Sequence, residues 1–110
     1  MAYEVYETRE AIEDASRIAE YMAERLKNPK AAMDFIECYD TEIKKLAFYP
    51  HAYKNTRLQY LDYEIRMKAF GTYHVFYIIK AEEKKVIVLR ILKNRQNWNH
   101  ILRIHNKYHW

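Results

Sequence analysis

A chain of 110 residues is long enough for one hydrophobic core and too short for two, so we expect a single domain over residues 1–110. Hydrophobic residues make up 50% of the chain, which excludes a disordered protein. The net charge of +4 suits an anionic partner such as RNA, DNA or an acidic protein, and selects none of them.

The first half of the chain predicts a strand followed by a helical hairpin. Residues 3–6 alternate apolar and charged side chains, as a short strand does. Thr8 can cap a first helix, whose buried stripe would be Ala11, Ala15, Ile18, Met22 and Leu26. Asn28 and Pro29 suit the start of a second helix, with an apolar face of Ala32, Phe35, Ile36, Tyr39, Ile43, Leu46 and Ala47. Because the link is short, the two helices should pack antiparallel.

The second half predicts an antiparallel meander after a loop. We expect an ordered loop between Tyr49 and Asp62, because that segment shows no clear periodicity. The strands expected after it are residues 63–69, 72–80 and 85–92. Gly71 favours a tight turn between the first two strands. This order of elements predicts an α+β fold, with the N-terminal strand and the helical hairpin on a mainly antiparallel sheet.

The end of the chain predicts a short helix and a tail. Asn97 can cap a helix that carries Trp98, Ile101 and Leu102, and residues 103–110 are expected to be a solvated tail. His105 and His109 have no acidic or thiol companions nearby in the sequence, so we expect no metal there, and the sequence indicates no cofactor.

Targeting signals and cysteine usage favour an ordinary intracellular protein. The first residues lack the basic and apolar regions of a signal peptide. No stretch approaches the roughly 20 apolar residues of a membrane span, so we expect a cytoplasmic protein without membrane association. Cys38 is the only cysteine, which excludes a disulfide, and its apolar helical surroundings predict a buried thiol.

Four basic side chains share one parity within the predicted strands, and these are Arg66, Lys68, His74 and Arg90. One face of the sheet could therefore carry a cationic cluster beside Phe76 and Ile78. A face of that kind needs an anionic and partly apolar cover.

Each of these side chains also has a structural interpretation. Arg66 and Lys68 would equally suit the solvated side of an edge strand. Arg90 interrupts an apolar strand and could pair with Glu64 or Asp62. His74 on a mixed face is more often a hydrogen-bonded structural histidine than a catalytic one, and Trp98 could anchor the last helix.

Several short motifs occur together, in order. They are Ala31-Ala32 early in the second helix, Leu46 with Pro50 at its end, Tyr73-His74-Val75-Phe76-Tyr77, and Val88-Leu89-Arg90-Ile91-Leu92-Lys93-Asn94-Arg95. With the order of elements, they give a chain that resembles the RelE/ParE toxin superfamily from residue 3 to about residue 102. The resemblance implies the toxin of a type II toxin–antitoxin pair, silenced by a cognate antitoxin encoded in a neighbouring gene.

The superfamily that the chain resembles divides by target. RelE-like members enter the ribosomal A site and cut mRNA, whereas ParE-like members poison DNA gyrase and lack the catalytic set. Cutting requires a base for the ribose 2′-OH, cations for the phosphorane charge and an acid for the leaving oxygen, with no metal.

The resemblance also implies candidate site residues. RelE-like nucleases have an arginine where this chain has His74, and another where it has Asn94, flanked by Lys93 and Arg95. Their proton-transferring tyrosine or histidine matches His100 in spacing. The implied catalytic set is His74, Arg95 and His100, and the implied RNA-binding residues are Arg66, Lys68, Arg90, Lys93 and Trp98.

Three functions remain open on the sequence. The preserved cationic, proton-capable positions place ribosome-dependent mRNA cleavage first, as a metal-independent endoribonuclease with the ribosome and mRNA as partners. The long helical hairpin and the two missing arginines favour a ParE-like gyrase inhibitor. The third is a non-toxic protein-binding module of the same fold.

Overall fold

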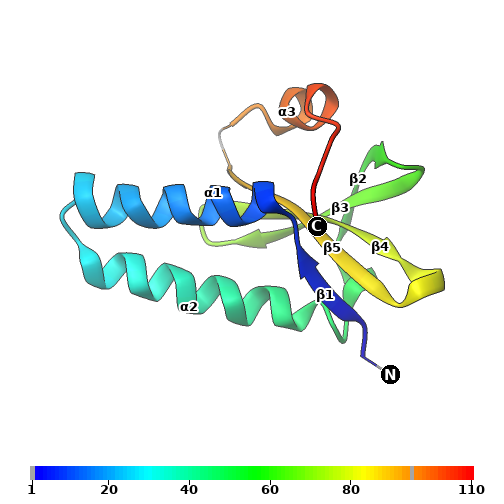
Figure 1. Cartoon of the computed structure of the whole chain (residues 1–110), viewed down its shortest axis with the longest axis horizontal. Coiled ribbons are helices and arrows are strands. Elements are labelled where there is room, and N and C mark those ends of the chain that lie inside the picture. Colours follow the sequence, from blue (N-terminus) through cyan, green and yellow to red (C-terminus); the bar gives the residue numbers. More distant parts are fainter. Residues whose placement is uncertain (1, 95) are drawn as a thin grey trace.

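The computed structural model describes residues 2–94 and 96–110 (Figure 1). The elements in chain order are β1 (Glu4–Glu7), α1 (Arg9–Glu20), a π-helical turn (Tyr21–Arg25), α2 (Pro29–Lys45), a 3-10 turn (Pro50–Ala52), β2 (Lys54–Tyr60), β3 (Tyr63–Phe70), β4 (Tyr73–Lys80), a second 3-10 turn (Ala81–Glu83), β5 (Lys85–Lys93) and α3 (Trp98–Ile104). The sheet order is β1-β5-β4-β3-β2, with β1 parallel to β5 and the other pairs antiparallel. The predicted α+β fold is confirmed.

The predicted helix caps are all present. The Thr8 hydroxyl accepts a hydrogen bond from the Ala11 backbone N–H at 3.0 Å, and Asn28 Oδ1 accepts one from Ala31 at the same distance. Asn97 Oδ1 accepts from the His100 N–H at 3.3 Å. Each cap satisfies an N–H that has no partner within its helix, and so fixes where the helix begins.

The buried stripe of α1 ends earlier than predicted. The Leu26 N–H bonds to the carbonyl of Tyr21, five residues back, at 3.1 Å. This wider turn rotates the residues that follow, and Leu26 is 57% exposed. On α2, Ile36 and Cys38 also face solvent, so the predictions that Leu26, Ile36 and Cys38 are buried are wrong.

A strand occupies the segment predicted as a loop. β2 pairs with β3 at the edge of the sheet, and its register slips between Asn55 and Gln59, where Arg57 has φ of 69°. The turn into β3 uses Leu61 and Asp62, both at positive φ, without the usual glycine. The irregular register and the polar composition of an edge strand removed the alternation that would have predicted it.

The sheet has a hydrophobic core on each face. On the hairpin face, α1 and α2 cover β4 and β5 through a cluster that includes Val75, Tyr77 and Val88. On the opposite face, which we call the α3 face, Leu102 and Tyr108 cover Phe76 and Ile78, both of which are 0% exposed. The chain therefore covers for itself the apolar residues that were expected to need a partner.

The last residues pack against the molecule. Tyr108 is buried, and its ring meets that of Tyr60 edge-on at 4.9 Å. The Arg9 N–H donates to the His109 carbonyl at 2.7 Å, and the His109 N–H donates to Glu10 at 3.0 Å. The prediction of a solvated tail is wrong, because these contacts fasten the C-terminus to the start of α1.

Candidate functional site

The register of the β3–β4 hairpin separates the basic residues predicted to share a face. Lys68 lies opposite Val75, and His74 lies opposite Ala69. Residues directly opposite in an antiparallel pair point to the same face, so Lys68 joins Val75 on the hairpin face and His74 lies on the α3 face. The prediction of one cationic face is wrong, because parity within a strand does not say how neighbouring strands align.

Arg66 and Lys68 hold the hairpin face together. Arg66 Nη1 donates to the Tyr53 carbonyl at 2.8 Å, which ties the start of β2 to β3. Lys68 is 8% exposed and pairs with Glu42 of α2. The hydrogen bond from Lys68 lowers the pKa of Glu42 below its ordinary value. Both cations therefore have structural partners, and neither lies on the solvated side of an edge strand.

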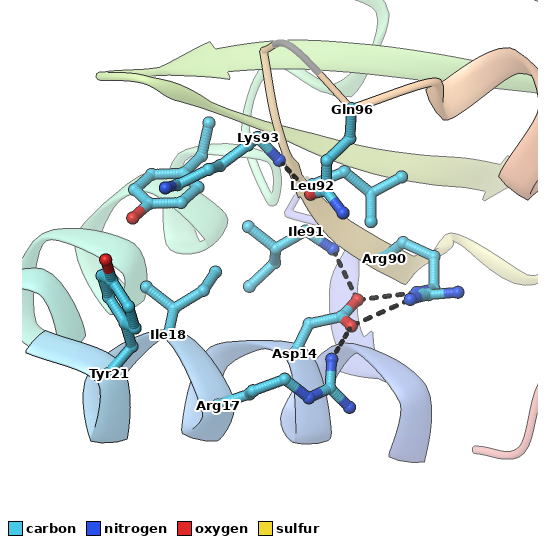
Figure 2. Close-up of a pocket in the computed structure, with 10 residues that line it drawn as sticks. Asp14, Arg17, Ile18, Tyr21, Arg90, Ile91, Leu92, Lys93 and Gln96 are labelled. Carbon is cyan, nitrogen blue, oxygen red and sulfur yellow. Dashed lines mark hydrogen bonds and ion pairs between the residues drawn. The ribbon is translucent and has the colours of Figure 1, made fainter. Parts of the chain in front are cut away.

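Arg90 pairs with Asp14 of α1, which is only 3% exposed (Figure 2). Arg90 Nε and Nη2 donate to the Asp14 carboxylate at 2.7 and 3.0 Å. The same carboxylate also accepts hydrogen bonds from the Ile91 backbone N–H at 3.0 Å and from Arg17 Nη1 at 3.3 Å. The predicted pairing of Arg90 is present, but the proposed partners Glu64 and Asp62 are wrong.

Because β1 is short, Asp14 of α1 can reach β5 and pair with Arg90. β1 pairs with β5 only as far as Val88, which leaves the rest of that edge without a strand. The Thr8 hydroxyl donates to the Leu89 carbonyl at 2.8 Å, and Asp14 accepts from Ile91 further along. Side chains of α1 thus replace the missing strand, and they satisfy backbone groups that would otherwise be buried without partners.

A pocket of about 370 Å³ opens beside this ion pair, between α1 and the C-terminal end of β5 (Figure 2). Its lining residues are Asp14, Arg17, Ile18, Tyr21, Tyr73, Arg90, Ile91, Leu92, Lys93 and Gln96. Lys93 Nζ lies 5.7 Å from the ring centroid of Tyr21, and the Lys93 N–H donates to the Gln96 side chain at 2.7 Å. The pocket therefore combines an apolar floor with basic side chains.

The remaining site residues lie toward the α3 face. The His74 ring is 6.1 Å from Phe76, which in turn is 5.5 Å from Trp98, so His74 and Trp98 share this side of the sheet. His100 is exposed on α3. Arg95 lies outside the described residues. Only part of the implied set is therefore brought together, because Lys93 lines the pocket on the other side of β5.

His74 is suited to accept a proton rather than to supply charge. Burial lowers the pKa of His74 below its ordinary value of 6.5, and the positive charge of Lys54 adds to the effect. Its Nδ1 is buried and has no hydrogen-bond partner among the described residues. A neutral imidazole can act as a base, but it is a poor phosphate clamp.

The described residues bring together no group of three or more His, Cys, Asp or Glu side chains that could hold a metal ion. No helix within the described ranges is long and apolar enough to cross a membrane.

The sequence interpretation missed Asp14, Arg17 and Tyr21. Asp14 lies three residues after Ala11 and four before Ile18, on the buried stripe of α1. A carboxylate on a buried helical stripe needs a cationic or N–H partner, and that spacing was the available signal. Nothing comparable marked Arg17 or Tyr21, whose role depends on the end of β5.

The comparisons with known proteins agree with this architecture. The model of the family "ParE toxin of type II toxin-antitoxin system, parDE" matches residues 5–98. No protein of curated function matches the chain.

Solved toxin–antitoxin structures share the fold. A chain of the chromosomal ParDE system from P. aeruginosa superposes with a TM-score of 0.68 at 17% identity, covering 84% of this chain and 96% of that one. The RelBE2 complex from Mycobacterium tuberculosis gives 0.57 at 20% identity, with 84% and 99% covered. A free mutant of the E. coli toxin RelE gives 0.59 at 16% identity, with 94% and 99% covered. Since the family match spans the first strand, the hairpin and the meander, the chain belongs to the ParE toxin family of type II toxin–antitoxin systems.

Proposed function

We propose that this toxin arrests bacterial growth by acting on DNA gyrase and does not cut mRNA. The observation that carries the proposal is that three cations expected to contact RNA already have internal partners. Arg66 holds the Tyr53 carbonyl, Lys68 holds Glu42 and Arg90 holds Asp14. To contact a phosphate, Lys68 would have to give up Glu42, which would keep only its pair with Lys45. Arg90 would have to give up its two bonds to the buried Asp14 carboxylate, which would keep only the Ile91 N–H and the longer contact with Arg17. Removing the main counter-charge of a buried carboxylate is unfavourable.

The positions where RelE-like nucleases carry arginine give the proposal further support. His74 has a lowered pKa and is mainly neutral at pH 7, so it provides little positive charge for a phosphorane. Asn94 is uncharged, and its N–H is used in a hydrogen bond to the Thr72 carbonyl at 2.9 Å. The match of residues 5–98 to the ParE toxin family supports the gyrase-directed alternative, which the sequence interpretation had placed second to mRNA cleavage.

Ribosome-dependent mRNA cleavage is the second candidate, and one observation favours it. His74 Nδ1 is buried without a partner in the described part of the chain, and a neutral imidazole of this kind can accept the 2′-OH proton. Exposed His100 could then protonate the leaving oxygen, and Trp98 could stack on a base. Because the toxin would supply only these few catalytic groups, the ribosome would have to position the mRNA for cleavage.

A timed expression experiment separates the two targets. The toxin is induced in growing bacteria, and methionine incorporation, the DNA-damage response and message integrity are followed over the first minutes. A gyrase inhibitor leaves early translation intact while the damage response rises, and purified toxin blocks supercoiling by purified gyrase. An immediate stop in methionine incorporation, with cut messages and unimpaired supercoiling, would overturn the gyrase proposal in favour of mRNA cleavage.

Three single substitutions test the catalytic set independently. If the toxin acts on gyrase, His74→Ala, Arg95→Ala and His100→Ala should each still arrest growth and remain neutralised by the antitoxin. If it cuts mRNA, loss of one positioned acid or base should reduce cleavage about 10²–10⁴-fold. Undisturbed growth at high levels of folded wild-type protein would contradict both targets and favour the non-toxic binding module.

A further inference from the structure

The pocket beside Asp14 carries more positive charge than the fold needs. Its lining holds three cations, Arg17, Arg90 and Lys93, and a single carboxylate, so two positive charges remain in excess. The charge of Arg90 is neutralised by Asp14, to which Arg90 donates two hydrogen bonds. Arg17 gives Asp14 one longer contact at 3.3 Å, and its side chain is 69% exposed. Lys93 makes no ion pair with any acidic residue that the structure describes, and lies against the ring of Tyr21.

The rest of the lining selects the kind of anion. Ile18, Ile91 and Leu92 form an apolar floor, and Tyr21 is a half-exposed wall. Arg17 and Lys93 come from α1 and β5 and flank that floor from opposite sides (Figure 2). None of the described lining residues belongs to a helix N-terminus, which is where converging N–H groups bind polyphosphates. A single carboxylate next to an apolar or aromatic side chain fits best, and an acidic amphipathic peptide supplies both.

We propose that an acidic residue of the cognate antitoxin binds in this pocket, with its carboxylate between Arg17 and Lys93 and a neighbouring apolar side chain against Ile18 and Tyr21. The inference rests on the chain being the toxin of a type II pair, and is independent of which target it acts on. Burial of Tyr21 and the charge match would both favour the bound state.

Binding there also places the antitoxin beside the end of β5. Lys93 is the last residue of that strand, and Asn94 follows directly. A segment seated between α1 and Lys93 lies against Gln96, which lines the same pocket shortly before α3. The antitoxin would thereby shield the strand end that the sequence associates with activity.

The test measures the affinity of purified antitoxin for refolded toxin variants. Lys93→Glu and Arg17→Gln should each raise the dissociation constant about tenfold. The double variant should raise it further than either single variant, by less than the product of the two effects, because both cations bind the same carboxylate. Lys30→Glu is the matched control, since Lys30 is an exposed helical cation paired with Asp34 within its own helix, and it should change affinity less than about twofold. Circular dichroism checks that each variant is folded, and Lys93→Gln replaces Lys93→Glu if the latter is not.

A charge-swap experiment identifies the partner residue. In the Lys93→Glu background, each acidic residue of the antitoxin is replaced by lysine in turn. One replacement should restore affinity to within a few-fold of the wild-type pair, and the same replacement should weaken binding to wild-type toxin.

The outcomes separate this inference from the proposed function. Antitoxin binding that is unchanged in the double variant overturns the pocket proposal. If the double variant instead loses inhibition of purified gyrase while its antitoxin affinity is unchanged, the pocket belongs to the target and the proposal is equally overturned. A wild-type chain that neither arrests growth nor binds the antitoxin would contradict the toxin function itself.

Discussion

The polar side chains on the two faces of the sheet differ in whether they have hydrogen-bond or ion-pair partners. On the hairpin face, Lys68 and Arg66 have internal partners, and Arg90 is held by α1 at the edge of β5. Toward the α3 face, His74 Nδ1, His105 Nε2 and the Tyr108 hydroxyl are buried without partners in the described part of the chain. Among the described residues of the hairpin face, only the Tyr39 hydroxyl is buried without a hydrogen-bond partner.

This difference separates structural cations from candidate functional groups. Polar groups that are fully paired stabilise a fold and are costly to recruit for binding. Buried polar atoms without partners are uncommon and often mark a place where a ligand or water supplies the missing bond. The hairpin face is therefore the stabilising side, apart from its pocket, and the α3 face is the side where proton transfer could occur.

The largest expected effect comes from Asp14. Asp14→Ala removes the acceptor of four donors and leaves Arg90 partly buried without its counter-charge. We expect the free energy of unfolding in urea to fall by about 3–5 kcal/mol. Asp34→Ala is the matched control, because the Asp34 side chain is 57% exposed in its pair with Lys30, and it should cost about 1 kcal/mol or less. Equal effects of the two substitutions would contradict a structural role for Arg90.

The next effect tests whether the C-terminus belongs to the fold. Tyr108→Ala deletes a buried ring from the α3-face core, so unfolding should become easier by about 3 kcal/mol. The neighbouring Trp110 is 48% exposed, and Trp110→Ala should cost about 1 kcal/mol or less. If Tyr108→Ala were as mild as Trp110→Ala in thermal and urea unfolding, the C-terminal residues would be the solvated tail predicted from sequence.

A moderate effect should follow from the link between Lys68 and Glu42. Because Lys68 lowers the pKa of Glu42, the unfolded chain binds more protons in acid, and the stabilisation is lost as the pH falls below about 4.5. Lys68→Ala should cost about 1–2 kcal/mol at pH 7 and flatten that acid dependence. Urea unfolding at a series of pH values gives both quantities. An unchanged acid dependence in Lys68→Ala would show that this pair does not stabilise the hairpin face.

The smallest effect concerns His74. Burial and Lys54 lower its pKa, so protonation favours the unfolded chain, and stability should decrease slightly as the pH is lowered through 6.5. An NMR titration should give His74 a pKa below 6.5, and Lys54→Ala should move it upward. A pKa at or above 6.5 in the wild type would contradict the effect of burial and of Lys54, and would mean that His74 is less available as a base than the structure indicates.

Much of the fold could be predicted because its signals are local. Thr8, Asn28 and Asn97 cap helices through bonds to residues only three positions away. The alternation of residues 63–69 predicted β3, and Gly71, which has φ of 57°, favoured the turn into β4. β2 was missed because its pairing depends on β3 and its own pattern is irregular.

The site could be predicted only in part, because it depends on alignment between distant segments. The sequence by itself determined the family, the order of elements and the residues that can carry charge or transfer a proton. The tertiary structure alone decided that Lys68 and His74 lie on opposite faces, that Asp14 takes Arg90, and that Arg17 and Lys93 flank one pocket. The physical reason is that strand register and helix packing set these distances, through contacts between distant residues such as Asp14 and Ile91, which are 77 positions apart.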